Sequence, residues 1–241
     1  MASQLSHLPE ITPEFSCAIV CSPKRINMAR SIKKELPFAK IVVDHAMEGS
    51  WPTHRKCCLE YDPNYSHHLV LEEDTKLSPN FIHHVNSIIK SVPNDKIISL
   101  FHMQAFEKGT QICQKEDRHF FTRNGSTGQA VLFPQHVMLS WLAWCDKNIR
   151  PEVPYEDTRL CLWLTYTKQT LWVCFPNLVE HLCPTSSTLG HFFNRENHVS
   201  GMFLSEYVDD IDWTHNINRV PKTAETIIDY RAFKKKWNIN L

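Results

Sequence analysis

The sequence predicts an α/β fold, a mostly parallel sheet flanked by helices, from the way its apolar residues are spaced. A continuous apolar run at residues 15–21 has the length of a buried strand, and residues 25–36 then carry apolar side chains at helical spacing. A second short apolar run follows at 40–44. This strand–helix–strand order is typical of parallel strands joined by crossover helices.

The later elements continue this alternation. We expect strands at 69–71, 97–101, 129–133 and 171–175, and helices at 53–61, 79–90, 134–144 and 158–165. Ser78 can cap the helix that starts at Pro79. Residues 102–128 lack an apolar pattern and predict a long loop. The pattern is irregular beyond residue 190, so we expect one domain at 1–190 and a C-terminal extension at 191–241, packed on or near the functional site.

Composition excludes several classes of protein. The 241 residues include 26 lysines and arginines and 26 acids, so no overall positive charge draws the chain to nucleic acid or membrane. Nine cysteines without a Cys-x-x-Cys pair predict buried thiols in a reducing compartment. Residues 1–10 do not resemble a signal peptide, and no apolar stretch approaches the ~18 residues of a membrane span. We therefore expect a cytoplasmic protein with no membrane span and no evident obligate protein partner.

One acidic stretch is the best candidate for a functional site. The apolar run Leu69–Leu71 ends in Glu72, Glu73 and Asp74, three carboxylates that repel one another unless a positive charge lies near. A hard divalent cation would supply that charge, whereas a solvated acidic turn would need none. Open α/β sheets bind ligands at the carboxyl ends of their strands, where Asp44, the acidic stretch and the 102–128 loop all fall. This coincidence favours a site.

The order of motifs along the chain adds a family resemblance. A strand ending in Glu72-x-Asp74 after two βα units resembles the Asp-x-Asp motif of GT-A-fold nucleotide-sugar glycosyltransferases. Gly128-Gln129 leading a strand, Glu156-Asp157 opening a helix, and His181 before a serine pair at 186–187 are similar to later motifs of that family. The resemblance covers residues 15–190, and it departs from the family in having glutamate at the first acidic position.

The resemblance implies a GT-A-like (Rossmann-like) fold and a set of residue roles. Asp74 and His181 would hold Mn²⁺ or Mg²⁺, which stabilises the departing nucleoside diphosphate. Asp157 or Glu156 would take the proton of the acceptor hydroxyl, or position the acceptor. The remaining candidates would bind the nucleotide-sugar donor: Arg25, Asp44, Arg55 (or its neighbour Lys56), Glu72, Glu73, Gly128 and Gln129.

The acceptor stays open at this level. The resemblance is to phage-encoded and bacterial enzymes, which makes a hydroxymethylated DNA base one acceptor, contacted by Arg118, Arg123 and the basic-aromatic tail at 231–237. A surface glycan, a lipopolysaccharide sugar or a protein is the alternative. A hypothesis of another class is an inactive nucleotide-binding or interaction protein. Glu156-Asp157 would then be an ordinary helix cap and His181 a hydrogen-bonded polar residue.

Overall fold

The computed structural model describes residues 11–104, 107–125, 128–182, 199–206, 208 and 211–223. Its strands are β1 (Phe15–Cys21), β2 (Lys40–Val43), β3 (His67–Glu72), β4 (Thr75–Leu77), β5 (Ile98–Ser99), β6 (Phe120–Arg123), β7 (Ala130–Pro134), β8 (Leu171–Cys174) and β9 (Val179–His181). Its α-helices are α1 (Ile26–Glu35), α2 (Ser50–Leu59), α3 (Phe81–Ser91), α4 (Glu107–Glu116), α5 (Gln135–Asn148) and α6 (Glu156–Thr167). The 3₁₀ turns η1 (Pro23–Arg25) and η3 (Ile217–Arg219) complete the elements used below.

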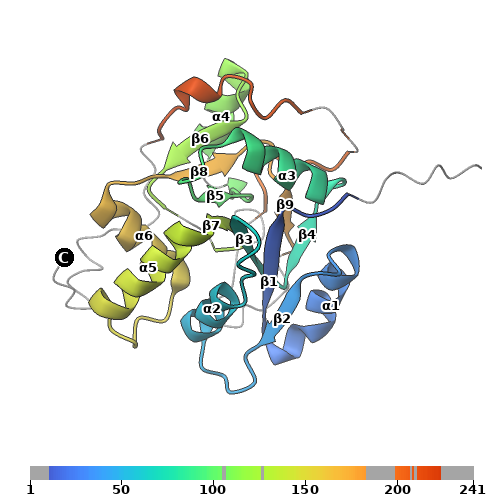
Figure 1. The fold of residues 1–241 in the computed structure, drawn as a ribbon. Helices are drawn as coiled ribbons and strands as arrows, with labels where there is room; N and C mark the ends of the chain where they lie inside the picture. The colour runs from blue at the N-terminus through green and yellow to red at the C-terminus, as the bar shows by residue number, and fades with distance from the viewer. Residues whose placement is uncertain are drawn as a thin grey trace, which may run out of the picture.

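A seven-stranded sheet in the order β2-β1-β3-β7-β5-β8-β6 forms the centre of the molecule, and β4 pairs with β9 in a small second sheet (Figure 1). Strand β1 is parallel to β2 and β3, and β5 is parallel to β8. Strand β7 is antiparallel to β3 and β5, and β6 is antiparallel to β8. The predicted α/β class is confirmed. The sheet is mixed, with two of its strands running against the other five.

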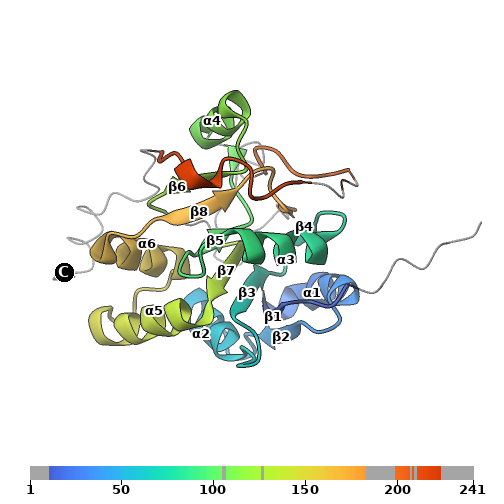
Figure 2. The same ribbon diagram turned by 45° about the horizontal axis from the view of Figure 1, so that its top comes forward.

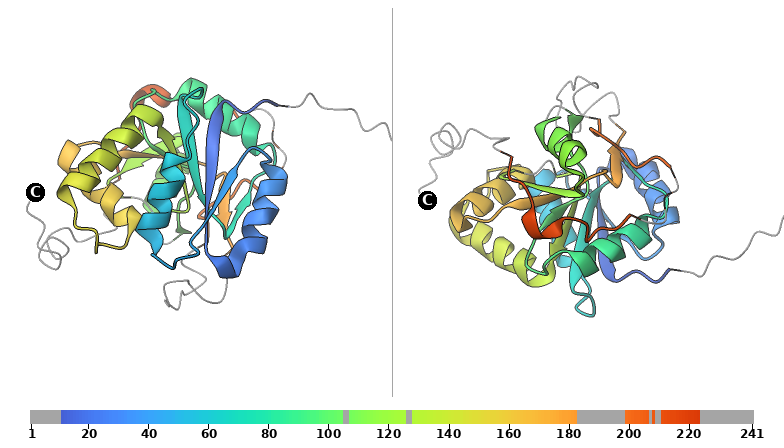
Figure 3. Two further views of the ribbon diagram at one scale, coloured as in Figure 1. Left: turned by 60° about the horizontal axis from the view of Figure 1, so that its bottom comes forward. Right: turned by 90° about the horizontal axis from the view of Figure 1, so that it is seen from above.

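Alternating side chains of the strands supply two hydrophobic cores, one on each face of the sheet. In β1, Phe15, Cys17 and Ile19 face the core formed with α1 and α3, whereas Ala18 faces the core formed with α2, α5 and α6. Figure 2 shows these two groups of helices on opposite sides of the strands, and Figure 3 shows the same layers from below and from above. Burial on both faces explains why the strands are continuous apolar runs.

The predicted loop at 102–128 is wrong over most of its length, because α4 and β6 lie within it. Helix α4 buries only Gly109 and Cys113, so it has almost no apolar stripe to reveal it in the sequence. Strand β6 gains its order from pairing with β8 and from the segment 211–223 on its other side. The Thr122 amide donates to the Pro221 carbonyl and the Thr223 amide to the Thr122 carbonyl, each over 2.8 Å.

Two further properties follow from the described residues. The eight cysteines among them are all buried and free, as their apolar surroundings in the sequence predict. None of the helices in this part of the chain combines the length and the apolar character that crossing a bilayer requires.

Candidate active site

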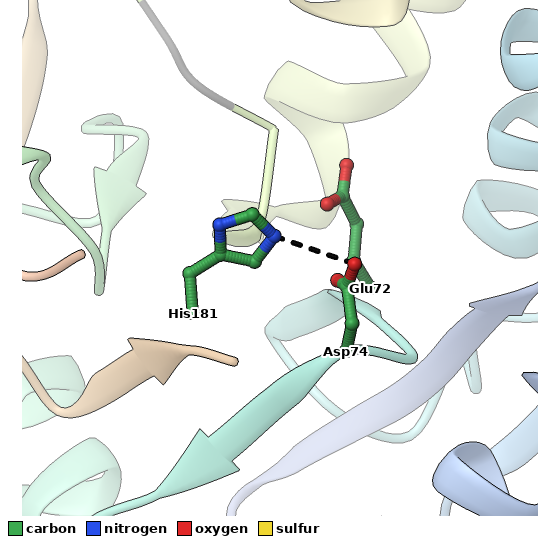
Figure 4. Close-up of side chains that lie close together, drawn as sticks. All are labelled: Glu72, Asp74 and His181. Carbon is green, nitrogen blue, oxygen red and sulfur yellow. Dashed lines mark ion pairs between the residues drawn. The ribbon is translucent and has the colours of Figure 1, made fainter. Parts of the chain in front are cut away.

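The pairing of β4 with β9 brings Asp74 and His181 together. Thr75 is opposite His181 in the register, and the Leu182 amide donates to the Asp74 carbonyl over 2.8 Å. The two side chains therefore approach each other from neighbouring strands, and His181 Nε2 lies 3.3 Å from Asp74 Oδ2 (Figure 4). Two residues 107 positions apart in the sequence become a contact pair through a sheet of only two short strands.

Glu72 completes a three-residue group that fits a metal ion. It is the last residue of β3, and one potential ligand atom from each of Glu72, Asp74 and His181 lies within 4.8 Å of the others (Figure 4). Ligands of a hard cation at ~2.0–2.6 Å stand roughly 3–5 Å apart, so small side-chain movements suffice. Asp74 is 5 % exposed, and its Oδ1 atom is buried with no hydrogen-bond partner. Two carboxylates and an imidazole are ligands that suit Mn²⁺, and the orphaned oxygen is a free position for it.

The protein itself supplies part of the positive charge that the acidic stretch needs. Arg25, in the turn after β1, places Nη1 2.7 Å from Asp74 Oδ2 and 3.5 Å from Glu73 Oε1. The Ser22 amide also donates to Glu73 Oε1, over 3.4 Å. Burial alone would raise the pKa of Asp74, but the His181 hydrogen bond and the charges of His181 and Arg25 bring it below its usual value. Glu73 is buried in this ion pair and does not point to solvent.

A second group of acids meets the first at Gly128. The backbone of Gly128 has a φ of +81°, and a Cβ atom there would lie 2.9 Å from Glu156 Oε1 and 3.2 Å from Glu72 Oε1. Gln129, the next residue, accepts the Glu72 amide on its carbonyl over 2.9 Å. The carboxylates of Glu72 and Glu156 therefore both lie against the backbone that precedes β7. This close approach is possible because glycine has no Cβ atom.

Glu156 and Asp157 form the first turn of α6, where the helix dipole favours negative charge. The Ser50 hydroxyl at the start of α2 donates to Glu156 Oε2, and the Thr158 amide donates to Asp157 Oδ1 over 2.5 Å. Ser50 was not among the predicted residues, since the sequence analysis places it before the helix expected at 53–61, whereas α2 begins at Ser50. The sequence order thus predicts the two acids, and the fold adds the hydroxyl that orients one of them.

The excess of negative charge affects the protonation of the acids. Burial, and then the neighbouring charge of Asp157, raises the pKa of Glu156 to about 8. Burial likewise raises the pKa of Asp157. Burial and the charges of Asp74 and Glu156 hold the pKa of Glu72 well above its usual value. A divalent cation beside these carboxyls would oppose all three shifts by favouring their charged forms.

Three predicted donor-binding residues lie outside this group and have partners of their own. The two carboxylate oxygens of Asp44 accept the amides of Glu48 and Gly49 over 2.8 and 2.9 Å, which folds the loop after β2. Arg55 pairs with Asp146 on α5 through Nε at 3.1 Å and Nη2 at 2.7 Å. Its neighbour Lys56 pairs with Glu48 over 2.5 Å. The structure therefore does not bring Arg55 or Lys56 to the acids.

The predicted DNA-contacting residues are divided between described and undescribed parts of the chain. Arg123 is 1 % exposed and donates to the Gly125 carbonyl over 2.7 Å, so it is not placed to contact a phosphate backbone. Arg118 donates to the carbonyls of Asn216 and Arg219 over 2.9 and 2.6 Å. The serine pair at 186–187 and the tail at 231–237 lie outside the described residues.

Segments of the predicted C-terminal extension lie at two places. The Ser200 amide donates to Glu180 Oε1 over 2.7 Å, and Asn177 Nδ2 donates to Ser200 Oγ over 2.6 Å. Residues around 200 therefore lie beside β9, the strand that carries His181. Residues 211–223 lie instead along β6, at the edge of the large sheet.

A cavity of about 620 Å³ lies away from the acids, between the end of α1 and the start of α3. Residues 36–38 and 77–83 provide most of its lining, and the three residues of the metal-fitting group do not contribute to it. We therefore locate the candidate site by its chemistry, at the carboxyl end of β3, and not by the size of this cavity.

The arrangement offers ligands for a divalent cation and, next to Gly128, a second carboxyl that can exchange a proton. No model of a known protein family matches the chain, and a comparison with curated proteins found no similar sequence.

Proposed function

We propose that the chain is a glycosyltransferase that moves a sugar from a nucleoside-diphosphate donor to a hydroxyl acceptor. The convergence of Glu72, Asp74 and His181 is the observation that carries this proposal. It lies at the carboxyl edge of an α/β sheet, where such folds bind nucleotides. The order of acidic, glycine and histidine motifs in the sequence supports the same reading, as does the contact of Glu156 with Gly128.

Asp74, His181 and Glu72 would hold Mn²⁺ or Mg²⁺ in this proposal. Bound there, the ion would act as a Lewis acid that neutralises charge on the departing diphosphate. The Asp74 Oδ1 atom is buried without a hydrogen-bond partner, which leaves an acceptor for a cation. Burial and then the charge of Asp74 raise the pKa of Glu72, and a cation at this position would stabilise both carboxylates.

Glu156 is the candidate general base. In a direct displacement the acceptor hydroxyl passes its proton to Glu156 while its oxygen bonds to the anomeric carbon, and the bond from that carbon to the diphosphate breaks. Glu156 lies against Gly128, as Glu72 does, and accepts a hydrogen bond from the Ser50 hydroxyl. A carboxyl whose pKa lies near 8 can exchange a proton close to neutral pH. Asp157 raises that pKa by its charge and is the second candidate for the same role.

The acceptor is proposed only as a hydroxyl compound. Arg118 and Arg123 are engaged within the protein, so the described residues add nothing to the case for DNA. A hydroxymethylated DNA base as acceptor requires salt-sensitive binding of DNA, since phosphate contacts release counterions. A surface glycan or lipopolysaccharide acceptor requires no such dependence. Binding of duplex and single-stranded DNA at two salt concentrations separates the two versions.

A donor screen tests the proposed activity. The full chain is incubated with Mn²⁺ and UDP-, GDP- and CDP-sugars, and release of the nucleoside diphosphate is measured with and without EDTA. We expect one donor to be hydrolysed slowly by water, at a rate that EDTA abolishes and that Glu156→Gln lowers about 100-fold. Asp146→Asn, at an exposed acid that pairs with Arg55, serves as the control and keeps the wild-type rate.

A competing account treats the acids as structural. The Arg25 ion pairs favour it, because they already place a cation on Asp74 and Glu73. In that case no donor is turned over, and the protein binds a nucleotide without metal or does not bind one.

A further inference from the structure

Arg25 and His181 contact the same oxygen of Asp74. Arg25 Nη1 lies 2.7 Å from Asp74 Oδ2, and His181 Nε2 lies 3.3 Å from that atom. The other oxygen, Oδ1, is buried without a hydrogen-bond partner. The guanidinium thus occupies part of the space around Asp74 that a metal ion would share with His181.

The backbone places Arg25 at this position. Strand β1 ends at Cys21, and the Arg25 amide donates to the Ser22 carbonyl over 2.9 Å, closing the turn η1. The Ser22 amide donates to Glu73 and the Arg25 side chain pairs with Asp74, so both ends of the turn contact the acidic stretch. The side chain of Arg25 retains 14 % exposure.

We propose that Arg25 competes with the divalent cation for Asp74 and binds the donor diphosphate once the cation has displaced it. This inference rests on the proposed function, and it adds that binding of cation and nucleotide is coupled through one side chain. Arg25 then acts as the counter-ion of Asp74 only while the metal site is empty.

Charge is the physical reason for the exchange. A buried carboxylate that loses a paired cation is strongly destabilised, so Arg25 stays on Asp74 in the absence of metal. A divalent ion on Asp74 would repel a guanidinium a few ångströms away. The displaced guanidinium needs an anion, and its planar donors match two phosphate oxygens better than a lysine ammonium does.

Titration of Mn²⁺ into full-length protein tests the competition without measuring turnover. Arg25→Gln removes the competing charge, so we expect Mn²⁺ alone to bind this variant at least about threefold more tightly than wild type. Arg55→Gln is the matched control, because Arg55 also pairs with a carboxylate but lies outside the acidic group, and it leaves Mn²⁺ affinity unchanged. Arg25→Lys keeps the charge and retains an affinity close to that of wild type.

A second titration tests the coupling, with UDP, GDP and CDP added in saturating Mn²⁺. We expect the nucleotide that wild type prefers to bind about tenfold more weakly to Arg25→Gln, while Mn²⁺ itself binds more tightly. Equal or weaker Mn²⁺ binding by Arg25→Gln overturns the competition, and unchanged nucleotide binding overturns the phosphate contact. If Arg25→Gln does not fold, Arg25→Lys tests the phosphate contact. Lysine lacks the planar guanidinium, so this variant must still bind the nucleotide more weakly than wild type. Wild-type protein that binds no Mn²⁺ contradicts the proposed function itself, which is a separate outcome.

Discussion

Gly128 is the residue on which the two acidic groups meet. Its φ of +81° and its closeness to the carboxylates of Glu72 and Glu156 are independent constraints, and Gly49 has only the first of them. Gly49 has a φ of +102°, but a Cβ atom there would meet nothing within 4 Å. An alanine at Gly49 would therefore cause backbone strain alone, whereas an alanine at Gly128 would also crowd the two carboxylates.

We expect Gly128→Ala to lower the free energy of unfolding by about 2–4 kcal/mol, and Gly49→Ala by only about 1–2 kcal/mol. The difference arises because the new methyl group at 128 must push the carboxylates apart. Urea unfolding of the two variants measures both values. Equal losses would mean that Glu72 and Glu156 do not approach Gly128 as described.

The raised pKa of Glu156 makes stability depend on pH. Folding raises this pKa from 4.5 to about 8, so the folded protein binds the proton more tightly than the unfolded chain does. The resulting stabilisation is complete below about pH 4.5 and is lost as the pH rises to about 8. Each pKa unit corresponds to about 1.4 kcal/mol, so the metal-free protein should lose up to about 4 kcal/mol over this range.

Urea unfolding at several pH values between 4.5 and 8.5, in the presence of EDTA, measures this dependence. Glu156→Gln should reduce the slope of unfolding free energy against pH, whereas Glu60→Gln, at an exposed residue paired with Lys40, should keep it. If the Glu156 and Glu60 variants both keep the wild-type slope, Glu156 does not carry the proton in question.

Individual site residues differed in how far the sequence could predict them. Asp74 and Glu156 follow from motif order, since Asp74 lies three residues after an apolar run and Glu156 precedes the helix expected at 158–165. The partner of Arg25 does not follow from it, because Arg25 and Asp74 lie 49 positions apart and meet only through the turn after β1. Arg55 was expected to bind the donor, but it pairs with Asp146 on α5, and nothing in the local sequence indicates this partner.

At the scale of elements, the segment around Trp213 covers the outer part of the sheet. Trp213 is 1 % exposed, and its ring centroid lies 5.9 Å from that of His84 on α3 and 5.6 Å from that of His119. The ring of Phe120 on β6 lies 5.7 Å away. Through these contacts the C-terminal residues complete the hydrophobic core beside α3.

We expect Trp213→Ala to lower the free energy of unfolding by about 3–5 kcal/mol, since it leaves a large cavity in that core. Tyr166→Ala is the control, because this ring on α6 is 57 % exposed and should contribute less than about 1 kcal/mol. Urea unfolding monitored by circular dichroism gives both numbers. A small loss for Trp213→Ala would show that the segment is not part of the core.

The elements also show where sequence patterns are informative. Strands β1 and β3 are buried on both faces, so apolar composition alone reveals them. Strands β4 and β9 have three residues each and are defined by their pairing with each other. Such long-range pairing leaves no local pattern, although it is what joins Asp74 to His181. The same holds for β6, whose order depends on β8 and on residues 211–223.

At the scale of the whole molecule, one edge of the sheet gathers the candidate chemistry. Arg25 lies in the turn after β1, Glu72 ends β3, and Gly128 precedes β7. Glu156 begins α6, and His181 ends β9. Strand order predicts this convergence, because the carboxyl ends of parallel strands share an edge. The antiparallel strand β7 adds to it by starting where β3 ends.

The most direct test of this account is calorimetric titration of UDP, GDP and CDP into the full chain, with Mn²⁺ and with EDTA. We predict that one nucleoside diphosphate binds only when Mn²⁺ is present, and that Asp74→Asn abolishes this binding while Asp146→Asn, at an exposed site, preserves it. Absence of binding by all three nucleotides in Mn²⁺, or binding that neither EDTA nor Asp74→Asn alters, would contradict the account.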